Sequence, residues 1–451
     1  GTFLIEKPAD NPNYKANVEM FAKSFDGNRN KTYATWQYFG SPVKAANRDQ
    51  LPLESTWVRK YNRTLNVPNS DEKWEDVTTG TLTQGEAYEI TQPKPANYRF
   101  IGELNTGDFT FNVNGMASAT NYQDMNILAN PYTGAMNIEK LDFSGATAAD
   151  KVVYLFNTGS RKDWIANNGA NATINTGVTE GQYTKAIPAN LAGYVNGMPK
   201  DIPSLSSFMV KSTGAGTLKY RYADLVNVVA TENRAPERRF HSLAVDVESA
   251  KSADRLWLVQ AEGTTDRYDN GWDGEKIFAP GETALYAMQD RSYQVTTTET
   301  IGETKLGFVP AEGEQNYKLT FHIDGADGAQ EYTLLDKRTG LTRAIHDGDT
   351  YEFTATKGDA AHRFTILGNG AKATADQRGF QISADLRRNF TVKNFTDQPA
   401  EALVFDAAGK IQARFTVEPG SENTGTVVMP GAYVVRVSNK VTTLTQRFVM
   451  P

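Results

Sequence analysis

The sequence predicts an all-β protein. Apolar and polar residues alternate over about four to eight positions, as at Tyr317, Leu319 and Phe321, and this period of two is typical of half-buried strands. Clusters of Gly, Asn, Asp and Pro separate the runs and indicate tight turns. Thr, Tyr, Phe and Val are abundant, and their branched or aromatic side chains fit a pleated surface.

The composition limits both the architecture and the chemistry. The chain has 451 residues, which corresponds to about three domains of ordinary size. It contains no cysteine, so disulfide scaffolds, thiolate zinc sites and cysteine nucleophiles are excluded. The net charge of −6 argues against nucleic acid as a partner, and no apolar run approaches the roughly 20 residues of a membrane-spanning helix. No leader-like segment follows Gly1, so we expect any export signal to have been removed or to lie upstream.

An internal repeat predicts a duplicated β-sandwich-like region over residues 1–232, with repeats of about 1–115 and 116–232. The matched pairs include Trp36 with Met125, Tyr38 with Ile127, Gly40 with Ala129, Pro42 with Pro131, Leu51 with Leu141, and Tyr88 with Phe208. The growing spacing predicts an insertion in the second copy between Trp164 and Phe208. Chance similarity between two strand-rich segments is the alternative. In a true duplication the two copies would bury their apolar faces against each other, because one small sheet buries too little surface alone.

Two polar stretches mark the remaining boundaries. Residues 232–239 are charged, and residues 369–378 are poor in apolar side chains and indicate a linker. The block between them, residues 233–368, has several strand-like runs and predicts a second β-sandwich. Residues 379–451 form a last unit with short alternating strands, which predicts a small immunoglobulin-like C-terminal domain.

No local catalytic motif is present. Gly368, Gly370 and Ala373 match a dinucleotide fingerprint, but Gly379 interrupts the helix that such a site needs, so we expect no cofactor of this kind. The four histidines are too few and too dispersed for a local zinc signature. A hydrolase triad assembled from distant parts of the chain remains open, because triads are recognised by geometry. We therefore expect a protein that is not an enzyme.

The segment TTDRYDNGWDGE is the most oxygen-rich stretch of the chain. Asp266, Asp269, Asn270 and Asp273 all lie in it, among glycines that let the backbone fold round an ion. Calcium binds about six to eight such oxygens, so a structural calcium ion held by the three aspartates is one interpretation. An Asx-rich turn is the other, because Asp, Asn and Gly are also ordinary turn residues.

Aromatic rings that stack on sugars are a further candidate feature. Trp57, Trp164, Trp257 and Trp272 are the tryptophans to consider. Trp57 and Trp164 lie at repeat-matched positions, which favours a role in the core. Trp272, set among Asp and Gly, is the candidate for ligand binding. A packing role is the alternative, because large aromatics dominate β cores.

Three short motifs of the last unit point to a known family. They are the hairpin ALVFDAAGKIQARF with Asp406, Gly409 and Lys410, the segment GAYVVRV with Gly431 and Tyr433, and the final strand LTQRFVM with Arg447. Together they resemble the C-terminal sorting domain of type IX (Por) secretion cargo in Gram-negative bacteria. Arg447 replaces the usual terminal Lys, and two residues follow the usual end. The resemblance implies that the type IX machinery is a partner.

The block Phe240–Leu367 resembles, more loosely, a β-sandwich domain that precedes this tail in large adhesin-like surface proteins of the same bacteria. The segments DRYDNGWDGEKIF, YTLLDKRTG, YEFTATKG and HRFTIL carry the resemblance. It implies a cell-surface or secreted location, and a chain that is the C-terminal part of a longer protein.

These expectations combine into a non-catalytic, exported surface protein of adhesive or scaffolding type, whose C-terminal domain directs secretion or anchoring. Its expected partner besides the secretion machinery is a glycan or a host or cell-surface protein. The alternative is a carbohydrate-binding module array from a larger glycan-processing protein, with an aromatic platform at Trp272 beside Asp269 and Asp273.

Overall fold

The computed structural model describes residues 3–11, 13–24, 36–67, 70–115, 124–157, 183–192, 195, 197–226, 240–250, 252–325, 331–338, 341–368, 379–385, 387–396, 398–440 and 443–450. The boundary expected at 232–239, the linker expected at 369–378 and Trp164 lie outside these ranges.

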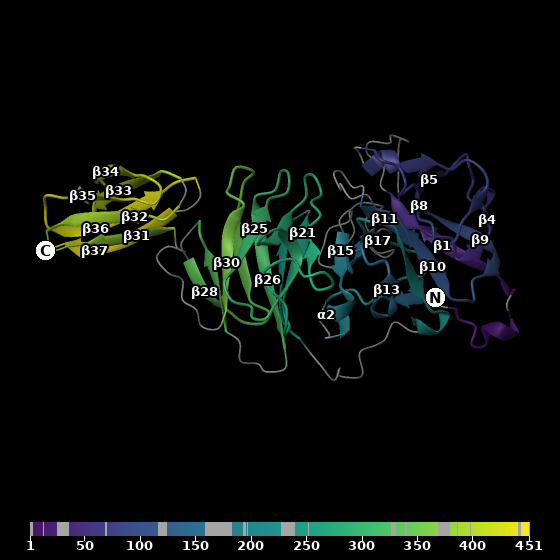
Figure 1. Cartoon of the computed structure of the whole chain (residues 1–451). Coiled ribbons are helices and arrows are strands. Elements are labelled where there is room, and N and C mark those ends of the chain that lie inside the picture. Colours follow the sequence, from purple (N-terminus) through teal and green to yellow (C-terminus); the bar gives the residue numbers. More distant parts are fainter. Residues whose placement is uncertain are drawn as a thin grey trace.

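Almost all of the regular structure is β, which confirms the predicted fold class. Figure 1 shows three bodies in a row, with the strands up to residue 226 at one end, residues 240–368 in the middle and residues 379–450 at the other end. Within the part of the chain that is described, no helix is long and apolar enough to cross a membrane.

The first unit covers residues 3–104. Its elements are η1 (Pro8–Asp10), β1 (Lys15–Ala22), β2 (Gln37–Phe39), β3 (Val43–Lys44), β4 (Ala46–Asn47), η2 (Arg48–Gln50), β5 (Trp57–Tyr61), η3 (Ser70–Lys73), β6 (Trp74–Asp76), β7 (Thr81–Leu82), β8 (Tyr88–Thr91) and β9 (Ala96–Leu104). One sheet has the order β2-β8-β5-β6, a second has the order β1-β9-β3, and β4 pairs with β7. Phe39, Tyr88 and Phe100 lie in the core of this unit.

The second unit covers residues 109–226. Its elements are β10 (Phe109–Val113), β11 (Met125–Ala129), β12 (Ala135–Asn137), η4 (Ile138–Lys140), β13 (Asp142–Gly145), β14 (Val153–Phe156), β15 (Tyr183–Ala186), α2 (Pro188–Ala192), β16 (Asp201–Ile202), β17 (Ser207–Lys211), β18 (Gly216–Tyr220), η5 (Tyr222–Asp224) and β19 (Leu225–Val226). Its sheets have the orders β11-β17-β14-β15, β10-β18-β13 and β16-β12-β19.

The two units share one strand order. The sheet β2-β8-β5-β6 corresponds strand for strand to β11-β17-β14-β15, and β1-β9 corresponds to β10-β18. A short 3-10 helix follows an Asn cap in both, at Asn47 and Asn137. β10 lies before the repeat boundary expected near 115, yet it pairs with β18 of the second unit. The shared order supports the duplication, which stays a prediction about origin.

The two units also pack on each other. The rings of Tyr38 and Phe156 stack with centroids 4.4 Å apart, and the backbone N–H of Ala129 donates to the Gly85 carbonyl at 3.0 Å. A Cβ atom on Gly40 would lie 2.3 Å from that of Ala129, so a larger residue at position 40 would push the units apart.

The middle domain consists of β20 (His241–Glu248), β21 (Ala253–Gln260), β22 (Gly274–Glu275), β23 (Ala284–Met288), β24 (Ser292–Thr298), β25 (Thr304–Val309), β26 (Asn316–Asp324), β27 (Tyr332–Asp336), β28 (Leu341–Ile345), β29 (Thr350–Thr354) and β30 (His362–Gly368). They form one hydrogen-bonded sheet in the order β28-β27-β30-β25-β23-β24-β21-β20-β26-β29, with β22 paired to β24. β21 and β24 are parallel, and the other strand pairs of this sheet are antiparallel.

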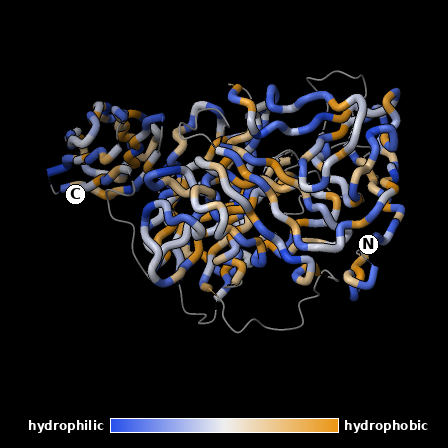
Figure 2. Tube along the Cα trace, turned by 45° about the vertical axis from the view of Figure 1, so that its right-hand side comes forward, coloured by the Kyte–Doolittle hydropathy of each residue, from blue (hydrophilic) through white to orange (hydrophobic). Residues whose placement is uncertain are grey.

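The strand β21 is buried on both faces. Leu256 and Leu258 point into the core of the middle domain, while Trp257 and Val259 belong to the core of the second unit. This explains the continuous apolar run from Leu256 to Val259, since a strand that is covered on both faces has no position left for an exposed polar side chain. Figure 2 shows hydrophobic stretches inside the middle domain and hydrophilic loops toward its edges.

The C-terminal unit is a small sandwich of two sheets. Its strands are β31 (Phe380–Ala384), β32 (Asn389–Asn394), β33 (Ala400–Asp406), β34 (Ile411–Val417), β35 (Glu422–Thr426), β36 (Gly431–Ser438) and β37 (Thr443–Met450). The sheet orders are β31-β32-β35 and β34-β33-β36-β37. Phe390, Val404 and Val435 lie in a core of its own, and the backbone N–H of Thr443 donates to the carbonyl of Arg338 in the middle domain.

Candidate functional site

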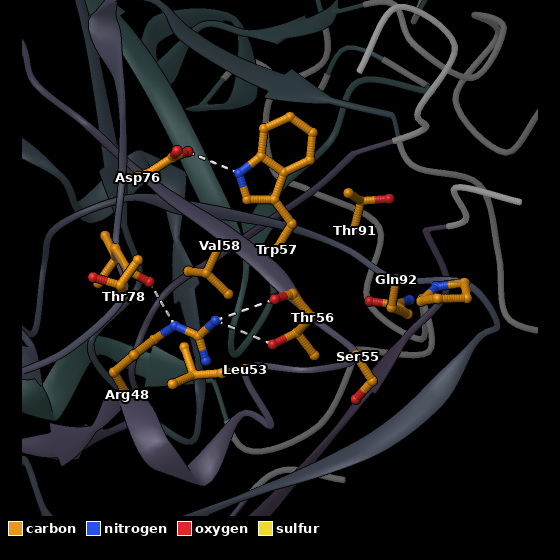
Figure 3. Close-up of a pocket in the computed structure, with 12 residues that line it drawn as sticks. Arg48, Leu53, Ser55, Thr56, Trp57, Val58, Asp76, Thr78, Thr91 and Gln92 are labelled. Carbon is orange, nitrogen blue, oxygen red and sulfur yellow. Dashed lines mark hydrogen bonds between the residues drawn. The ribbon is translucent and has the colours of Figure 1, made fainter. Parts of the chain in front are cut away.

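A cavity of about 340 Å³ lies at one end of the sheet β2-β8-β5-β6 in the first unit (Figure 3). β5 runs antiparallel to both β6 and β8, so the start of β5 meets the ends of its two neighbours. The cavity is lined by Arg48, Leu53, Ser55, Thr56, Trp57, Val58, Asp76, Val77, Thr78, Thr91, Gln92 and Pro93.

Arg48 holds the loops that form one wall of this cavity. Its side chain is buried, and its Nε atom donates to the Val77 carbonyl at 2.7 Å. Its terminal nitrogens donate to the Leu51 carbonyl and to both oxygens of Thr56, which Figure 3 shows in part. Burial lowers the pKa of this guanidinium. All three guanidinium nitrogens therefore already serve the protein itself.

Trp57 forms the aromatic part of the wall. Its indole Nε1 donates to Asp76 Oδ1 at 2.7 Å, as Figure 3 shows. The rings of Trp36 and Trp57 pack in a T-shaped arrangement with centroids 4.8 Å apart, and the guanidinium of Arg59 lies 5.4 Å from the centre of the Trp57 ring. These contacts fix the orientation of the indole beside the cavity, so its position does not depend on a ligand.

Thr91 and Gln92 bring polar atoms to the cavity wall from the end of β8. Both side chains are buried, with 1% and 2% of their surface exposed. The Gln92 amide nitrogen donates to the carbonyls of Ala22 and Ser24 at 3.1 and 2.5 Å. Gln92 Oε1 and Thr91 Oγ1 have no hydrogen-bond partner among the described residues. Buried polar atoms of this kind cost about 1–3 kcal/mol each unless something else satisfies them.

Sequence reasoning did not find this cavity. The repeat-matched position of Trp57 predicts a core role, whereas its side chain is only partly buried and lines the cavity. The sequence pattern that indicates the cavity is Trp57 at the start of one strand, with Asp76 and Thr91–Gln92 at the ends of two others. Those positions are far apart in the sequence, so only the strand pairing brings them together.

The Asx-rich loop lies elsewhere, against the second unit. Asp269 Oδ2 accepts from the backbone N–H of Thr265 at 2.6 Å, and the side chain of Asp273 is fully buried. Asn270 Oδ1 accepts from the backbone N–H of Lys151 in the second unit at 2.9 Å. Asp266 is exposed. In the described residues, no group of three or more His, Cys, Asp or Glu side chains is placed to hold a metal ion, and both interpretations of the loop, a calcium site and an Asx-rich turn, stay predictions.

Trp272 takes part in the same interface. Its ring lies 5.7 Å from that of Phe240, and its backbone carbonyl accepts from Thr297 Oγ1 at 2.7 Å and from Asn190 Nδ2 at 3.3 Å. The side chain is half-buried, so its packing role has direct support, while ligand binding there stays a prediction. Trp257 is fully buried and has no surface to offer a ligand.

The motif residues of the C-terminal unit build a hairpin and a strand start. Asp406 accepts from the backbone N–H groups of Ala408 and Lys410 at 2.9 and 3.0 Å, and Gly409 has the positive φ of 78° that the turn requires. These bonds lower the pKa of the Asp406 carboxyl. Tyr433 is buried, and its hydroxyl donates to the Met429 carbonyl at 2.6 Å.

The other end of the motif lies on an edge strand. β37 is the last strand of its sheet, Gly431 pairs with Met450, and Arg447 opposite Val434 is exposed. Val449, Val428 and Met429 are exposed to 83%, 82% and 67%, so apolar side chains lie open near this edge.

Comparisons relate the chain to other proteins. The sequence model of the family described as "Domain of unknown function (DUF8693)" matches residues 24–367. The chain is 31% identical to the "Minor fimbrium subunit Mfa5" of Porphyromonas gingivalis over 474 aligned residues, which cover 100% of this chain and 38% of that protein. A solved "Biofilm associated protein - BSP domain" aligns with 100% of this chain and 97% of its own at 10% identity, with a TM-score of 0.15.

Proposed function

This chain belongs to the family described as Domain of unknown function (DUF8693), and we propose that it is a non-catalytic, exported cell-surface protein of adhesive or scaffolding type. The observation that carries the proposal is the 31% identity to a minor fimbrium subunit along the whole chain. The chain spans 38% of the length of that relative. We therefore extend to this chain its surface location and structural character only.

The architecture supports a load-resisting role. The second unit and the middle domain share a core through β21, and the buried Lys185 side chain donates to Gln294 Oε1 across the same contact. The two N-terminal units are joined by the contacts of Tyr38 and Gly40. Bodies joined through buried apolar surface resist bending better than bodies on free linkers, which suits an adhesin or a fimbrial component.

We further propose that the C-terminal unit directs export and anchoring through the type IX machinery. The capped turn at Asp406 and the buried Tyr433 support this, because they give the resembling motifs a rigid form. The edge strand β37 with the exposed Val449 provides unpaired backbone and apolar surface, which is the chemistry of recognition by strand addition.

Deletion of residues 379–451 in the native host tests the proposal. The middle domain has a separate core, so we expect the shortened protein to fold and to stay in the periplasm. Protease accessibility on intact cells measures surface display. Normal display of the shortened protein would contradict the sorting role.

A matched pair of single substitutions separates the motif from the fold. Asp406→Ala removes a turn cap within the motif, whereas Asp385→Ala removes a similar cap on Arg387 and Asn389 outside it. We expect only the first to reduce display. Equal loss in both variants would show that display follows the stability of the C-terminal unit.

A carbohydrate-binding array from a larger glycan-processing protein is the second candidate. Its support is the cavity beside Trp57, since indole rings with neighbouring hydroxyl and carboxylate groups are common means of binding sugars. Binding to a glycan array by the full chain, with no adhesion to host or bacterial surfaces, would favour this candidate over the adhesive one.

A further inference from the structure

We propose that the cavity beside Trp57 is a binding site for one or two rings of a neutral saccharide. The inference does not depend on the surface role; it rests on the second candidate function and names the class of ligand for that cavity. The cavity of about 340 Å³ lies within the range of about 300–1,000 Å³ that is usual for small-ligand sites.

The charges of the cavity favour a ligand without negative charge. Arg48 is the lining residue with a cationic side chain, and its nitrogens donate to Val77, Leu51 and Thr56. Four of the five N–H groups of the guanidinium are thus engaged within the protein, which leaves one for a ligand and rules out a bidentate contact with a phosphate or carboxylate. Asp76 adds a negative charge that would repel an anion. An acidic sugar or a phosphorylated ligand is therefore disfavoured.

The wall has both an apolar and a polar part. The indole of Trp57, with Leu53 and Val58, supplies apolar surface. An indole carries partial negative charge on its faces, which attracts the polarised C–H groups of a sugar ring. Ser55 and Thr78 add hydroxyl groups that exchange hydrogen bonds in either direction. A saccharide, with hydroxyls round its rim and C–H groups on its faces, matches both parts.

The strongest sign of a ligand is the pair of unsatisfied polar atoms. Gln92 Oε1 can only accept and Thr91 Oγ1 can donate or accept, and neither has a partner among the described residues. Both side chains line the cavity and are at least 98% buried. A sugar hydroxyl both donates and accepts, so one hydroxyl can complete either atom once the side chain turns toward the cavity, because both oxygens are fully buried in the free protein.

Substitution of Thr91 by valine tests the site with little risk to the fold. Thr91→Val keeps the shape and removes only the hydroxyl that lacks a partner, so the free protein should keep or slightly raise its melting temperature. The matched control is Thr184→Val in β15, since Thr184 Oγ1 is equally buried and unsatisfied but does not line the cavity.

The full chain and both variants are titrated with galactose, glucose, mannose and N-acetylglucosamine, and with glucosamine and glucuronate as charged probes. Tryptophan fluorescence and saturation-transfer NMR report binding. We expect at least one neutral sugar to bind, about a tenfold weaker affinity in Thr91→Val because one hydrogen bond is lost, and unchanged affinity in Thr184→Val.

Three results would overturn the inference. The first is the absence of binding to every neutral sugar at millimolar concentration. The second is equal affinity of Thr91→Val and the unchanged chain, which would place any binding elsewhere. The third is binding of glucosamine or glucuronate with no binding of neutral sugars, which would assign the cavity to a charged ligand.

Discussion

The Oδ1 atom of Asp273 accepts a hydrogen bond from the backbone N–H of Thr297 at 2.7 Å. Its Oδ2 atom accepts from the backbone N–H of Asp269 at 2.8 Å. The carboxyl group therefore ties the Asx-rich loop to β24 from a fully buried position, and burial raises its pKa to about 7. Asp273 therefore has a structural role in the free protein, at a position that the sequence makes a candidate metal ligand.

The raised pKa of Asp273 predicts a pH-dependent stability. Between about pH 4 and pH 7 the folded protein holds a proton that the unfolded chain has released, so the contribution of this group to the free energy of unfolding falls as pH rises through that window. Below about pH 4 Asp273 is protonated in both the folded and the unfolded state, and above about pH 7 it is ionised in both, so its contribution to the free energy of unfolding no longer changes with pH. Denaturant unfolding at pH 5 and pH 7.5 measures the difference. Asp273→Asn should remove this part of the pH dependence.

Asp273→Asn should also lower the stability itself. Asn has one acceptor oxygen in place of two, so its NH₂ group would face the backbone N–H of Asp269 or of Thr297. Two donors would then face each other, at a cost of about 1–3 kcal/mol. Asp266→Asn on the exposed part of the same loop is the control and should unfold as the unchanged chain does. Equal effects of the two substitutions would show that the buried bonds are not the cause.

Calcium titration separates the two interpretations of the loop. The carboxylates of Asp269 and Asp273 already accept hydrogen bonds from the backbone, and displacing these would cost free energy. We therefore expect calorimetry to give only the heat of dilution. Heat of binding together with a melting temperature that falls on adding a chelator would instead establish a calcium site.

Arg48 should be the side chain on which the cavity depends most for its shape. Arg48→Met keeps much of the apolar stem but leaves the carbonyls of Val77 and Leu51 without their donors, so we expect a loss of about 2 kcal/mol or more in the free energy of unfolding. Arg99→Met, which breaks an exposed pair with Glu19, is the control and should have little effect. Chemical denaturation compares the two variants. If Arg48→Met leaves the free energy of unfolding unchanged, Arg48 does not support the cavity wall.

Gly409 tests the hairpin of the C-terminal unit. Its φ of 78° is unfavourable for any residue with a Cβ atom, although nothing lies within 4 Å of the place that this atom would take. Gly409→Ala should therefore cost about 1 kcal/mol through the backbone alone. Gly358→Ala, which is equally uncrowded but has no positive φ, should be neutral or slightly stabilising. Urea unfolding of the two variants checks the difference.

Local patterns predicted most of the strands. The alternation at Tyr317, Leu319 and Phe321 corresponds to β26, where all three side chains are buried. The apolar residues Val435 and Val437 are likewise buried in β36. These predictions succeed because successive side chains of a strand point to opposite faces of the sheet, so buried and exposed positions alternate along the chain.

Contacts between distant segments could not be predicted in this way. Trp257 and Leu258 are neighbours in sequence, yet they enter two different cores, because the second unit covers the outer face of β21. Trp272 was a candidate for sugar binding, and its half-buried ring lies against Phe240. Nothing in the local sequence tells an exposed aromatic from one that a neighbouring domain covers.

By itself, the sequence determined the all-β class, the absence of thiol chemistry and the turn at Asp406, since these follow from composition and from the backbone preferences of neighbouring residues. Only the tertiary structure decided which polar groups meet. Trp57, Asp76 and Thr91 come from three strands and line one cavity because β5 runs antiparallel to β6 and β8. Strand pairing is long-range, so the place where strand ends converge is set by the packing of the sheet.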